Sequence, residues 1–367
     1  MKILSHRVSA VVVACLISVC CWAIEDIDLP GGFTIEEYAS VPNARSLALG
    51  DEGTVFVSTR KGRSVYAVVP DGEGTETIEL LDGLNSPNGI AFHDGDLYVA
   101  EIDRVTRYAD IESRLHDTPE AEVLDIELPS KKHHGWRYIG FGPDGKLYIS
   151  IGMPCNICDE SGYGQIIRMN ADGSERETYA EGVRNSVGFT WHPDTGHLWF
   201  TDNGRDMLGD DLPPDELNHA SAPGQHFGYP YCHAGEMSDP KFGEGKDCSD
   251  YRSPAQKLGP HVASLGVKFY TGDMFPAKYQ GQAFIAEHGS WNRSKKIGYR
   301  VTLVDLEDGV PVSYEPFATG WLENESVSGR PVDLLILPDG SMLLSDDHAG
   351  KLYRISYTEG ETQRQSL

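Results

Sequence analysis

Large apolar residues alternate with small or polar ones most clearly in the segment HHGWRYIGFGPDGKLYISI, which spans residues 133–151. Residues 136–142 alternate as a β-strand does, PDG at 143–145 is typical of a turn, and residues 146–151 alternate again. The pattern therefore predicts a β-hairpin. Two adjacent histidines, His133 and His134, begin it, although a packed hairpin requires neither. They are candidate functional residues, and surface loop residues are the alternative interpretation.

This hairpin pattern occurs six times, each time with a small-residue start, an apolar strand, a turn with glycine and a second apolar strand. The six segments are 44–60, 86–101, 133–151, 184–203, 266–287 and 330–346. A third strand is predicted after four of them, at 64–69, 105–108, 165–169 and 351–357. Small sheets that cannot bury both faces alone can pack radially. We therefore predict an all-β fold, a six-bladed β-propeller over residues 24–367, since a pair of β-sandwiches would not explain the repeat.

The longest interval between turn glycines runs from Gly196 to Gly281. Its excess lies in residues 204–265, which are rich in proline, glycine, aspartate and histidine and contain Cys232 and Cys248. We predict a disulfide-stapled insertion between blades four and five that forms a wall of a pocket. A surface loop without a function is the alternative.

The N-terminus has the pattern of a secretory signal. Lys2 and Arg7 precede an apolar run at 8–19, and Ala23 supplies a small residue at the expected cleavage site. We predict a cleaved signal peptide over 1–23, no membrane span in the mature chain, and a periplasmic or secreted protein; a lipoprotein attached through Cys15 is the alternative. The net charge of −25 makes nucleic acid and anionic membranes poor candidate partners.

Four cysteines follow the signal segment. An even number of cysteines in an exported chain favours disulfides, and the pairs Cys155–Cys158 and Cys232–Cys248 are each local in sequence. A redox motif at CNIC would be expected within a βαβ unit, and none is predicted there. A zinc site would need a second close cysteine pair.

Polar residues gather where the predicted strands begin or end. His134, Arg184, Asn185 and Arg330 precede first strands. Arginines and a histidine converging in so acidic a protein suit a multiply anionic ligand, whereas salt bridges between blades are the alternative. The segment DNGRDMLGDDLPPDELN at 202–218 has the oxygen density that Ca²⁺ prefers, or is simply an acidic solvated loop.

Four motifs, HGWRYIGFGPDGKLYISIG, GVRNSVGFTWHPDTGHLWFTDNGRD, PPDELN with HFGYP, and GRPVDLLILPDG, resemble the soluble quinoprotein glucose/sorbosone dehydrogenases. PCNIC and FIAEHGSWNRS are more similar to the sorbosone-dehydrogenase-like branch. The resemblance covers essentially the whole mature chain. It implies a six-bladed propeller that binds pyrroloquinoline quinone (PQQ) and Ca²⁺.

The resemblance also assigns roles to residues. It implies that His134 is the general base and that backbone carbonyls of Gly204 and Arg205 hold Ca²⁺. The cofactor-binding residues that it implies are Arg184, Asn185, His288 and Arg330, with His261 and Arg293 as substitutes for missing contacts. Three positions depart from the glucose-oxidising branch: His133 stands in place of an aspartate, His288 in place of a lysine, and Val332 in place of a second arginine.

We thus predict a PQQ- and calcium-dependent dehydrogenase of aldose or ketoaldose sugars that passes electrons to an external acceptor, a cytochrome or a quinone. His134 would remove a proton, a hydride would pass to the quinone, and Ca²⁺ with Arg184 would stabilise the developing charge. We expect His133 and His134 to point to opposite sides, as adjacent strand residues do, so that only one faces the channel. The alternatives are a calcium-dependent sugar-lactone hydrolase, which would need carboxylates clustered around its metal, and a non-catalytic binding propeller.

Overall fold

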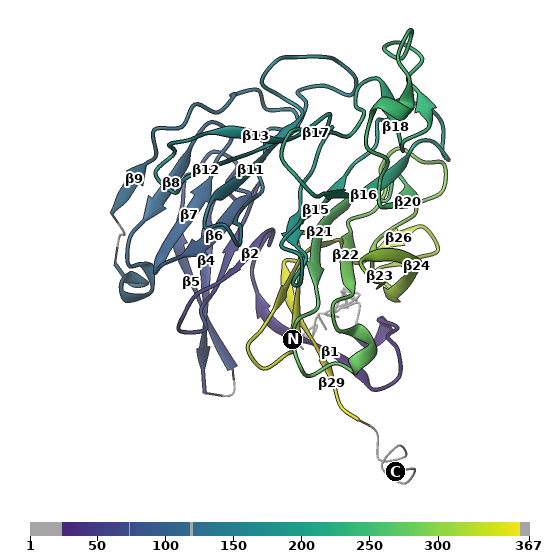
Figure 1. Ribbon diagram of the computed structural model, residues 1–367. Coiled ribbons are helices and arrows are strands. Elements are labelled where there is room, and N and C mark those ends of the chain that lie inside the picture. The colour runs from purple at the N-terminus through teal and green to yellow at the C-terminus, as the bar shows by residue number, and fades with distance from the viewer. Residues whose placement is uncertain (1–23, 73, 118–119, 360–367) are drawn as a thin grey trace, which may run out of the picture.

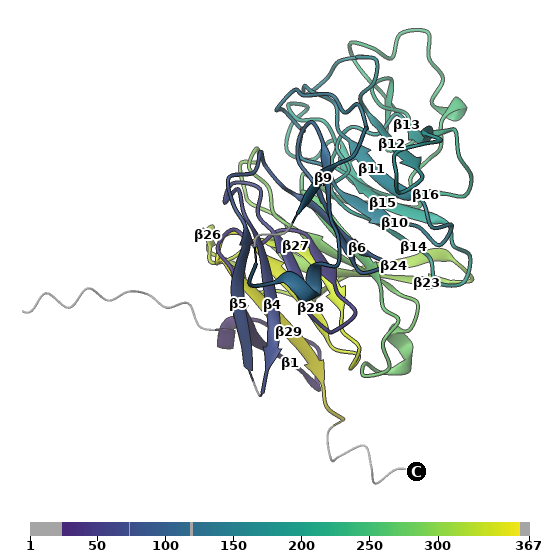
Figure 2. The ribbon, with the colours of Figure 1, turned by 90° about the vertical axis from the view of Figure 1, so that its left-hand side faces the viewer.

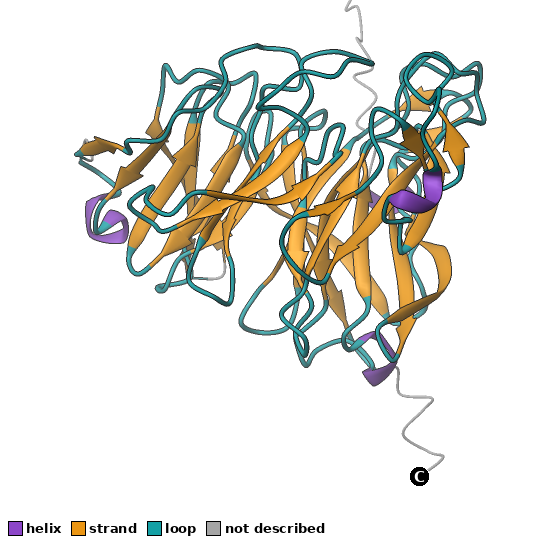
Figure 3. Cartoon of the chain, turned by 45° about the horizontal axis from the view of Figure 1, so that its top comes forward, coloured by secondary structure: helices purple, strands orange, loops and turns teal. Residues whose placement is uncertain are grey.

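The computed structural model describes residues 24–72, 74–117 and 120–359, so the predicted signal peptide lies outside the described residues. Strands dominate the described chain, and its helices are single short turns (Figure 3). Six sheets are arranged around a centre as the blades of a propeller (Figures 1 and 3). Each has four antiparallel strands, and a short fifth strand adds in parallel to one of them. The predicted six-bladed β-propeller is therefore confirmed.

Blades one to three follow the chain from its N-terminal half. Blade one consists of β2 (Leu47–Leu49), β3 (Val55–Ser58), β4 (Val65–Asp71) and β5 (Gly74–Leu81). Blade two consists of β6 (Gly89–His93), β7 (Asp96–Ala100), β8 (Val105–Tyr108) and β9 (Ala121–Val123). Blade three consists of β10 (Ile139–Phe141), β11 (Leu147–Ile151), β12 (Gln165–Met169) and β13 (Glu177–Glu181).

Blades four to six complete the ring. Blade four consists of β14 (Phe189–Trp191), β15 (Leu198–Asp202), β16 (Pro214–Ala220) and β20 (Gln256–Pro260). Blade five consists of β21 (Ser264–Phe269), β22 (Ala283–Glu287), β23 (Arg300–Glu307) and β24 (Val310–Ala318). Blade six consists of β27 (Pro331–Ile336), β28 (Met342–Asp346), β29 (Lys351–Tyr357) and β1 (Phe33–Ser40).

Short helical turns, two hairpins and one short strand lie outside the four-stranded blades. They are the 3₁₀ turns η1 (Ile24–Asp26), η2 (Ile111–Arg114), η3 (Cys248–Asp250) and η4 (Ala277–Tyr279), the hairpins β18 (Cys232–His233) with β19 (Met237–Ser238) and β25 (Leu322–Glu323) with β26 (Ser326–Val327), and the strand β17 (Gln225–His226). No helix among the described residues is both long and apolar enough to cross a membrane.

The two ends of the described chain close the ring together. β1 pairs antiparallel with β29, with Phe33 opposite Tyr357, so blade six takes its outer strand from the N-terminal segment. The purple β1 and the yellow β29 accordingly lie side by side in Figures 1 and 2. This pairing covers what would otherwise be an open sheet edge and fixes the first blade against the last.

The inner strands approach each other closely at the centre. A Cβ added at Gly188 would lie 2.1 Å from the Leu265 carbonyl oxygen of the next blade, so only glycine fits there. A buried polar network also joins inner-strand segments of four blades. The Asp333 carboxylate accepts from the Leu47 amide at 3.0 Å and from the Tyr138 hydroxyl at 3.4 Å, and Lys268 donates to that hydroxyl at 3.1 Å. These contacts hold the segments that carry the site in fixed relative positions.

The predicted stapled insertion is present, and its limits are narrower than expected. Residues 204–265 include β16 and β20, which are the outer half of blade four, so the extra segment is 221–255 and lies within that blade. The Cys232–Cys248 disulfide staples it, with the Cα atoms 5.6 Å apart. Its strand β17 pairs with β13 of blade three, so the segment bridges two blades.

Candidate functional site

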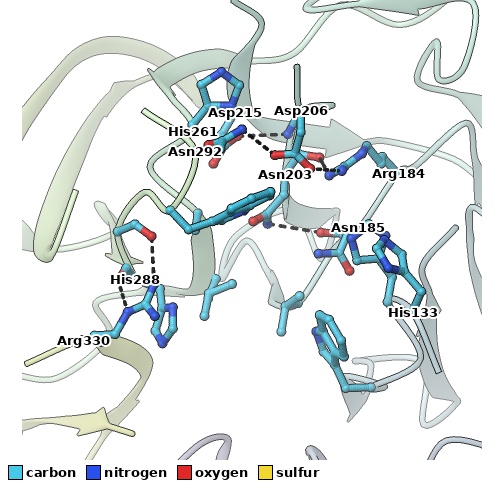
Figure 4. A pocket seen from close by; sticks show the side chains of 18 of the residues that line it. His133, Arg184, Asn185, Asn203, Asp206, Asp215, His261, His288, Asn292 and Arg330 are labelled. Carbon is cyan, nitrogen blue, oxygen red and sulfur yellow. Dashed lines mark hydrogen bonds and ion pairs between the residues drawn. The ribbon is translucent and has the colours of Figure 1, made fainter. Parts of the chain in front are cut away.

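A cavity of about 320 Å³ opens where first strands begin and second strands end, at the low end of the range for ligand pockets (Figure 4). Most of the site residues predicted from the sequence line this cavity. Those that line it are His133, His134, Arg184, Asn185, Gly204, His261, His288 and Arg330. Arg205 and Arg293 are not among its lining residues. The Arg205 guanidinium pairs with the buried Asp239, and Arg293 is hydrogen-bonded to the carbonyls of Lys295 and Asp210.

His134 is fixed as a neutral base. Its Nδ1 lies 2.8 Å from the Met153 carbonyl oxygen, which can only accept, so Nδ1 carries the hydrogen and Nε2 keeps its lone pair. Burial, together with the nearby charges of Arg184 and His133, lowers the pKa of His134 to about 2. The unliganded protein therefore holds this imidazole deprotonated at neutral pH.

The expectation that His133 and His134 point to opposite sides is wrong. Both line the cavity, and their ring centroids are 4.1 Å apart. The reason is that the pair lies in a turn rather than in a strand: β10 begins only at Ile139, and His134 has a φ of 48°. The two rings differ instead in burial, because His134 is only 7% exposed and His133 is exposed.

Arg184 is held mainly by the protein itself. Its Nε and Nη2 donate to the main-chain and side-chain oxygens of Asn156 at 3.0 and 3.1 Å, and Nη1 donates to the Asn203 carbonyl at 3.0 Å. Nη2 also pairs with Asp206 at 2.8 Å. Asn156 lies in the loop closed by the Cys155–Cys158 disulfide, which confirms that predicted pair. This loop therefore positions the arginine.

The same side of the cavity carries an excess of buried acid. Asp215 accepts from the backbone amides of Gly204 and Ser264, and Asp202 accepts from those of Arg184 and Asn185. Burial raises the pKa of Asp215 to about 7. It raises the pKa of Asp202 to about 8, and the neighbouring Glu216 adds to the effect. We call this side, with Arg184, Gly204, Asp206 and Asp215 on the cavity and Asp202 behind it, the acidic end.

The opposite side of the cavity is basic (Figure 4). Arg330 donates from Nε to the His288 carbonyl at 3.0 Å and from Nη2 to the Gly289 carbonyl at 2.9 Å, and it makes no ion pair with any described residue. His288 Nε2 lies 2.8 Å from the Asp347 carboxylate. Burial nevertheless lowers the pKa of His288 to about 4, with Arg330 and Arg45 opposing the effect of Asp347. We take His288 as neutral.

Two arginines that the sequence analysis did not single out, Arg45 and Arg60, also line this basic side. Arg45 is buried and pairs with Asp347 at 2.9 Å. The Arg60 guanidinium lies over the Trp136 ring, 4.2 Å from its centroid. The repeat could have revealed Arg45, because it lies at the start of the first hairpin segment as Arg184 and Arg330 do in theirs. We call Arg45, Arg60 and Arg330 the arginine end.

Apolar side chains separate the two ends. Trp136, Val187 and Leu265 line the cavity and pack with the buried Val332 in one cluster. Val332 is 2% exposed, so the position expected to carry a second arginine is part of this apolar surface. Such a surface suits the face of a flat ring system, with charged groups at either end.

The acidic end could hold a cation whose ligands are mostly backbone carbonyl oxygens, with few side-chain oxygens. Among the described residues, no group of three or more His, Cys, Asp and Glu side chains could hold a metal ion. At Gly204 the backbone lies close to the segment at Pro214, since a Cβ on Gly204 would lie 2.9 Å from the Pro214 carbonyl oxygen. Buried carboxylates with raised pKa values stand behind it. A hard cation would offset their charge.

Comparison with known proteins places the chain in a family. The model of the family described as glucose / sorbosone dehydrogenase matches residues 91–290, and a TrAA12-like model matches residues 237–358. The first match covers more than half of the chain. The protein therefore belongs to the glucose/sorbosone dehydrogenase family.

Two relatives and one solved structure illustrate the range of similarity. An uncharacterized protein of Borreliella burgdorferi is 31% identical over 349 residues, covering 90% of this chain and 91% of its own. Quinoprotein glucose dehydrogenase B of Acinetobacter calcoaceticus is 25% identical over 279 residues, covering 62% of this chain and 57% of its own. The holo form of the pyranose dehydrogenase PQQ domain from Coprinopsis cinerea superposes with a TM-score of 0.78 at 20% identity, over 90% of this chain and 97% of that domain, which shows a shared fold.

Proposed function

We propose that the protein is a PQQ- and calcium-dependent dehydrogenase of an aldose or ketoaldose sugar. The observation that carries the proposal is the polarity of the cavity. One end has buried carboxylates and a close backbone, the other has arginines, and His134 presents an unprotonated Nε2 within the same cavity. PQQ is a flat ring system with three carboxylates, and this arrangement suits it together with one divalent cation.

Each residue has a definite task in this proposal. Ca²⁺ binds at the acidic end through backbone carbonyls of Gly204 and Arg205, and Arg330 binds a cofactor carboxylate at the arginine end. Arg184 and Asn185 contact the quinone edge, although most of the donors of Arg184 already serve Asn156, Asn203 and Asp206. Bound PQQ supplies a two-electron acceptor for hydride from the sugar carbon.

His134 receives the proton of the sugar hydroxyl on Nε2. The Met153 carbonyl holds the ring in one tautomer and stabilises the imidazolium through the Nδ1 hydrogen bond. The lowered pKa of His134 describes the protein without a ligand. The carboxylates of a bound cofactor would favour the protonated imidazole, and a bound Ca²⁺ would favour the neutral one.

Arg293 and His261 have little to offer as cofactor ligands. His261 Nε2 lies 2.9 Å from the Gly209 carbonyl oxygen, and Arg293 is tied to the segment around Asp210. Both are bonded to the loop at residues 209–210. We therefore assign them to the loop structure and leave cofactor binding to the residues of the two ends.

The test is reconstitution of the mature protein in the periplasmic or secreted form that its N-terminal sequence predicts. PQQ with Ca²⁺ should yield a protein-bound quinone spectrum and dye reduction with at least one sugar of an aldose panel, and PQQ without Ca²⁺ or Ca²⁺ without PQQ should not. A dye stands in for the external acceptor, a cytochrome or a quinone. Hydrolysis of sugar lactones without PQQ would instead favour the hydrolase, which the ligand set disfavours because no three metal-binding side chains converge among the described residues.

A further inference from the structure

Arg60 is the cation of the arginine end whose guanidinium has no hydrogen-bond acceptor among the described residues. Arg45 has Asp347 as its counter-ion and Asn88 as a second acceptor, at 2.9 and 3.0 Å. Arg330 has two backbone carbonyls. Within the described chain, the Arg60 guanidinium makes neither a hydrogen bond nor an ion pair. All five of its N–H groups are therefore open to a ligand or to water.

Three guanidinium groups line one cavity, and of the three Arg45 alone makes an ion pair with a described residue, Asp347. Burial, together with the like charges of Arg45 and Arg330, lowers the pKa of Arg60 to about 10. In a chain with a net charge of −25, dispersal of these arginines over the surface would relieve that repulsion. Their convergence is explained if an anion occupies the space between them.

Trp136 holds Arg60 in place. The guanidinium carbon lies 4.2 Å from the centroid of the indole ring, which is within the range of a cation–π contact. An arginine stacked in this way keeps its edges free, and those edges carry the fork of donors that matches a carboxylate. Trp136 also belongs to the apolar surface formed with Val187 and Leu265. Arg60 therefore lies beside the surface against which the flat rings of the cofactor would pack.

The other candidates at this end cannot supply a second carboxylate contact. Val332 is apolar and buried. Neutral His288 donates from Nε2 to Asp347, which leaves an unprotonated Nδ1 that would repel a carboxylate. Arg45 is already paired with the Asp347 carboxylate, whereas Arg330 makes no ion pair with a described residue. Arg60 is the residue whose donors are uncommitted.

We propose that Arg60, on the segment that follows β3 in blade one, binds a carboxylate of the quinone cofactor together with Arg330 of blade six. This inference rests on the proposed function, because it takes PQQ as the ligand of the cavity. It names a cofactor-binding residue from a part of the chain in which the sequence analysis found none. It also explains how a cavity with valine at 332 and histidine at 288 can hold a multiply charged quinone.

The experiment is a spectroscopic titration of the calcium-loaded protein with PQQ, for the wild type, Arg60→Met and Arg60→Lys. Arg63→Met is the matched control, since Arg63 lies three residues along the same segment, is exposed, and does not line the cavity. Arg60→Met should bind PQQ about 10- to 100-fold more weakly, as expected for a lost hydrogen bond between charged groups. Arg60→Lys should fall between Arg60→Met and the wild type, because it keeps the charge and loses the fork. Arg63→Met should bind as the wild type does.

A second arm uses PQQ trimethyl ester, which keeps the ring system and lacks the carboxylate charges. The loss of affinity caused by Arg60→Met should largely disappear with the ester, since the interaction that the substitution removes is absent from that ligand. Melting curves of the unliganded variants show whether each is folded. If Arg60→Met does not fold, Arg60→Lys with the two ligands gives the same comparison.

The outcomes separate this inference from the proposed function. If the wild type binds no PQQ in the presence of Ca²⁺, both fail. If the wild type binds PQQ and oxidises a sugar while Arg60→Met keeps its PQQ affinity, only the role of Arg60 is refuted. A raised KM for an acidic sugar such as galacturonate, with unchanged PQQ affinity, would likewise refute it, because Arg60 would then bind the carboxylate of the substrate.

Discussion

The acidic end and the arginine end of the cavity differ in how far their buried charges are paired within the protein. At the acidic end, Arg184 is neutralised by Asp206 and bound by Asn156, and each buried carboxylate receives backbone amides. At the arginine end, Arg45 is paired with Asp347, whereas Arg330 and Arg60 make no ion pair with a described residue and Arg60 only stacks on Trp136. Charges that are paired within the protein contribute to its stability, whereas unpaired charges at a cavity contribute to the binding of a ligand. Substitutions at the two ends should therefore affect different measurements.

The largest effect is expected at His134, which lies beside the acidic end. His134→Ala should reduce turnover by about 10²- to 10⁴-fold, the usual contribution of a positioned base. PQQ and Ca²⁺ should still bind, because the arginine end is untouched. Steady-state kinetics of the reconstituted protein, with bound PQQ measured by absorbance, provide the test.

His133→Ala is the matched control for that substitution. His133 is exposed and makes no hydrogen bond with a described residue, so its loss should cost much less turnover. The acidic limb of the wild-type pH profile should lie below pH 6.5, since the pKa of His134 is lowered from that value, and it should be absent in His134→Ala. If His133→Ala abolishes turnover while His134→Ala retains it, the assignment of the base is wrong.

The next largest effect is expected on stability at the acidic end. Arg184→Met leaves Asp206 and both Asn156 oxygens without their cationic partner, and removal of one member of a buried ion pair typically costs about 3 kcal/mol or more. The free energy of unfolding of the unliganded protein should fall by that order in urea titrations. A stability equal to that of the wild type would mean that Arg184 is reserved for the ligand.

Arg330→Ala should have the opposite profile. Arg330 has no ion pair among the described residues, so its removal should change the melting temperature of the unliganded protein little. PQQ affinity should fall by about 2 kcal/mol, as for a lost charged hydrogen bond. Calorimetric titration with PQQ checks this value. A large loss of unliganded stability with unchanged PQQ affinity would show that Arg330 is a structural residue.

A further effect at the acidic end is a dependence of stability on pH. Burial raises the pKa of Asp202 to about 8 and that of Asp215 to about 7, above their value of 3.8 in the unfolded chain. Between these limits the folded state binds more protons than the unfolded state, so its stability falls as pH rises from about 4 to 8. Ca²⁺ should reduce this fall if it binds at the acidic end. Melting curves at pH 5 and pH 8, with and without Ca²⁺, measure both effects.

Much of the fold could be predicted from sequence because its signal is local. Alternation with a period of two and a glycine turn recur in each hairpin, and the third strands at 105–108, 165–169 and 351–357 have the observed limits. The fourth strands could not be found in this way. β9 is exposed along its length, and β13 is short, with exposed residues at both ends. β1 belongs to blade six because the N-terminal segment pairs with the last strand, β29, and no local pattern predicts that pairing.

The candidate site was predictable where residues occupy the same position in the repeat. His134, Arg184 and Arg330 all begin hairpin segments, and all three line the cavity. Arg60 was not predicted as a site residue because it stacks on the face of Trp136, and no spacing in the sequence indicates that contact. The relative orientation of His133 and His134 was misjudged because a turn with a positive φ breaks the alternation of a strand.

The orientation of the cofactor between the acidic end and the arginine end is the central prediction. A crystal structure of the protein loaded with PQQ and Ca²⁺, with the metal located by anomalous diffraction, tests this directly. We predict that Ca²⁺ lies at the Gly204 carbonyl, that a carboxylate of PQQ contacts Arg330 at the opposite end, and that His134 Nε2 faces the open side of the quinone. Ca²⁺ at the arginine end, PQQ turned with no carboxylate at Arg330, or PQQ bound outside this cavity would contradict the account.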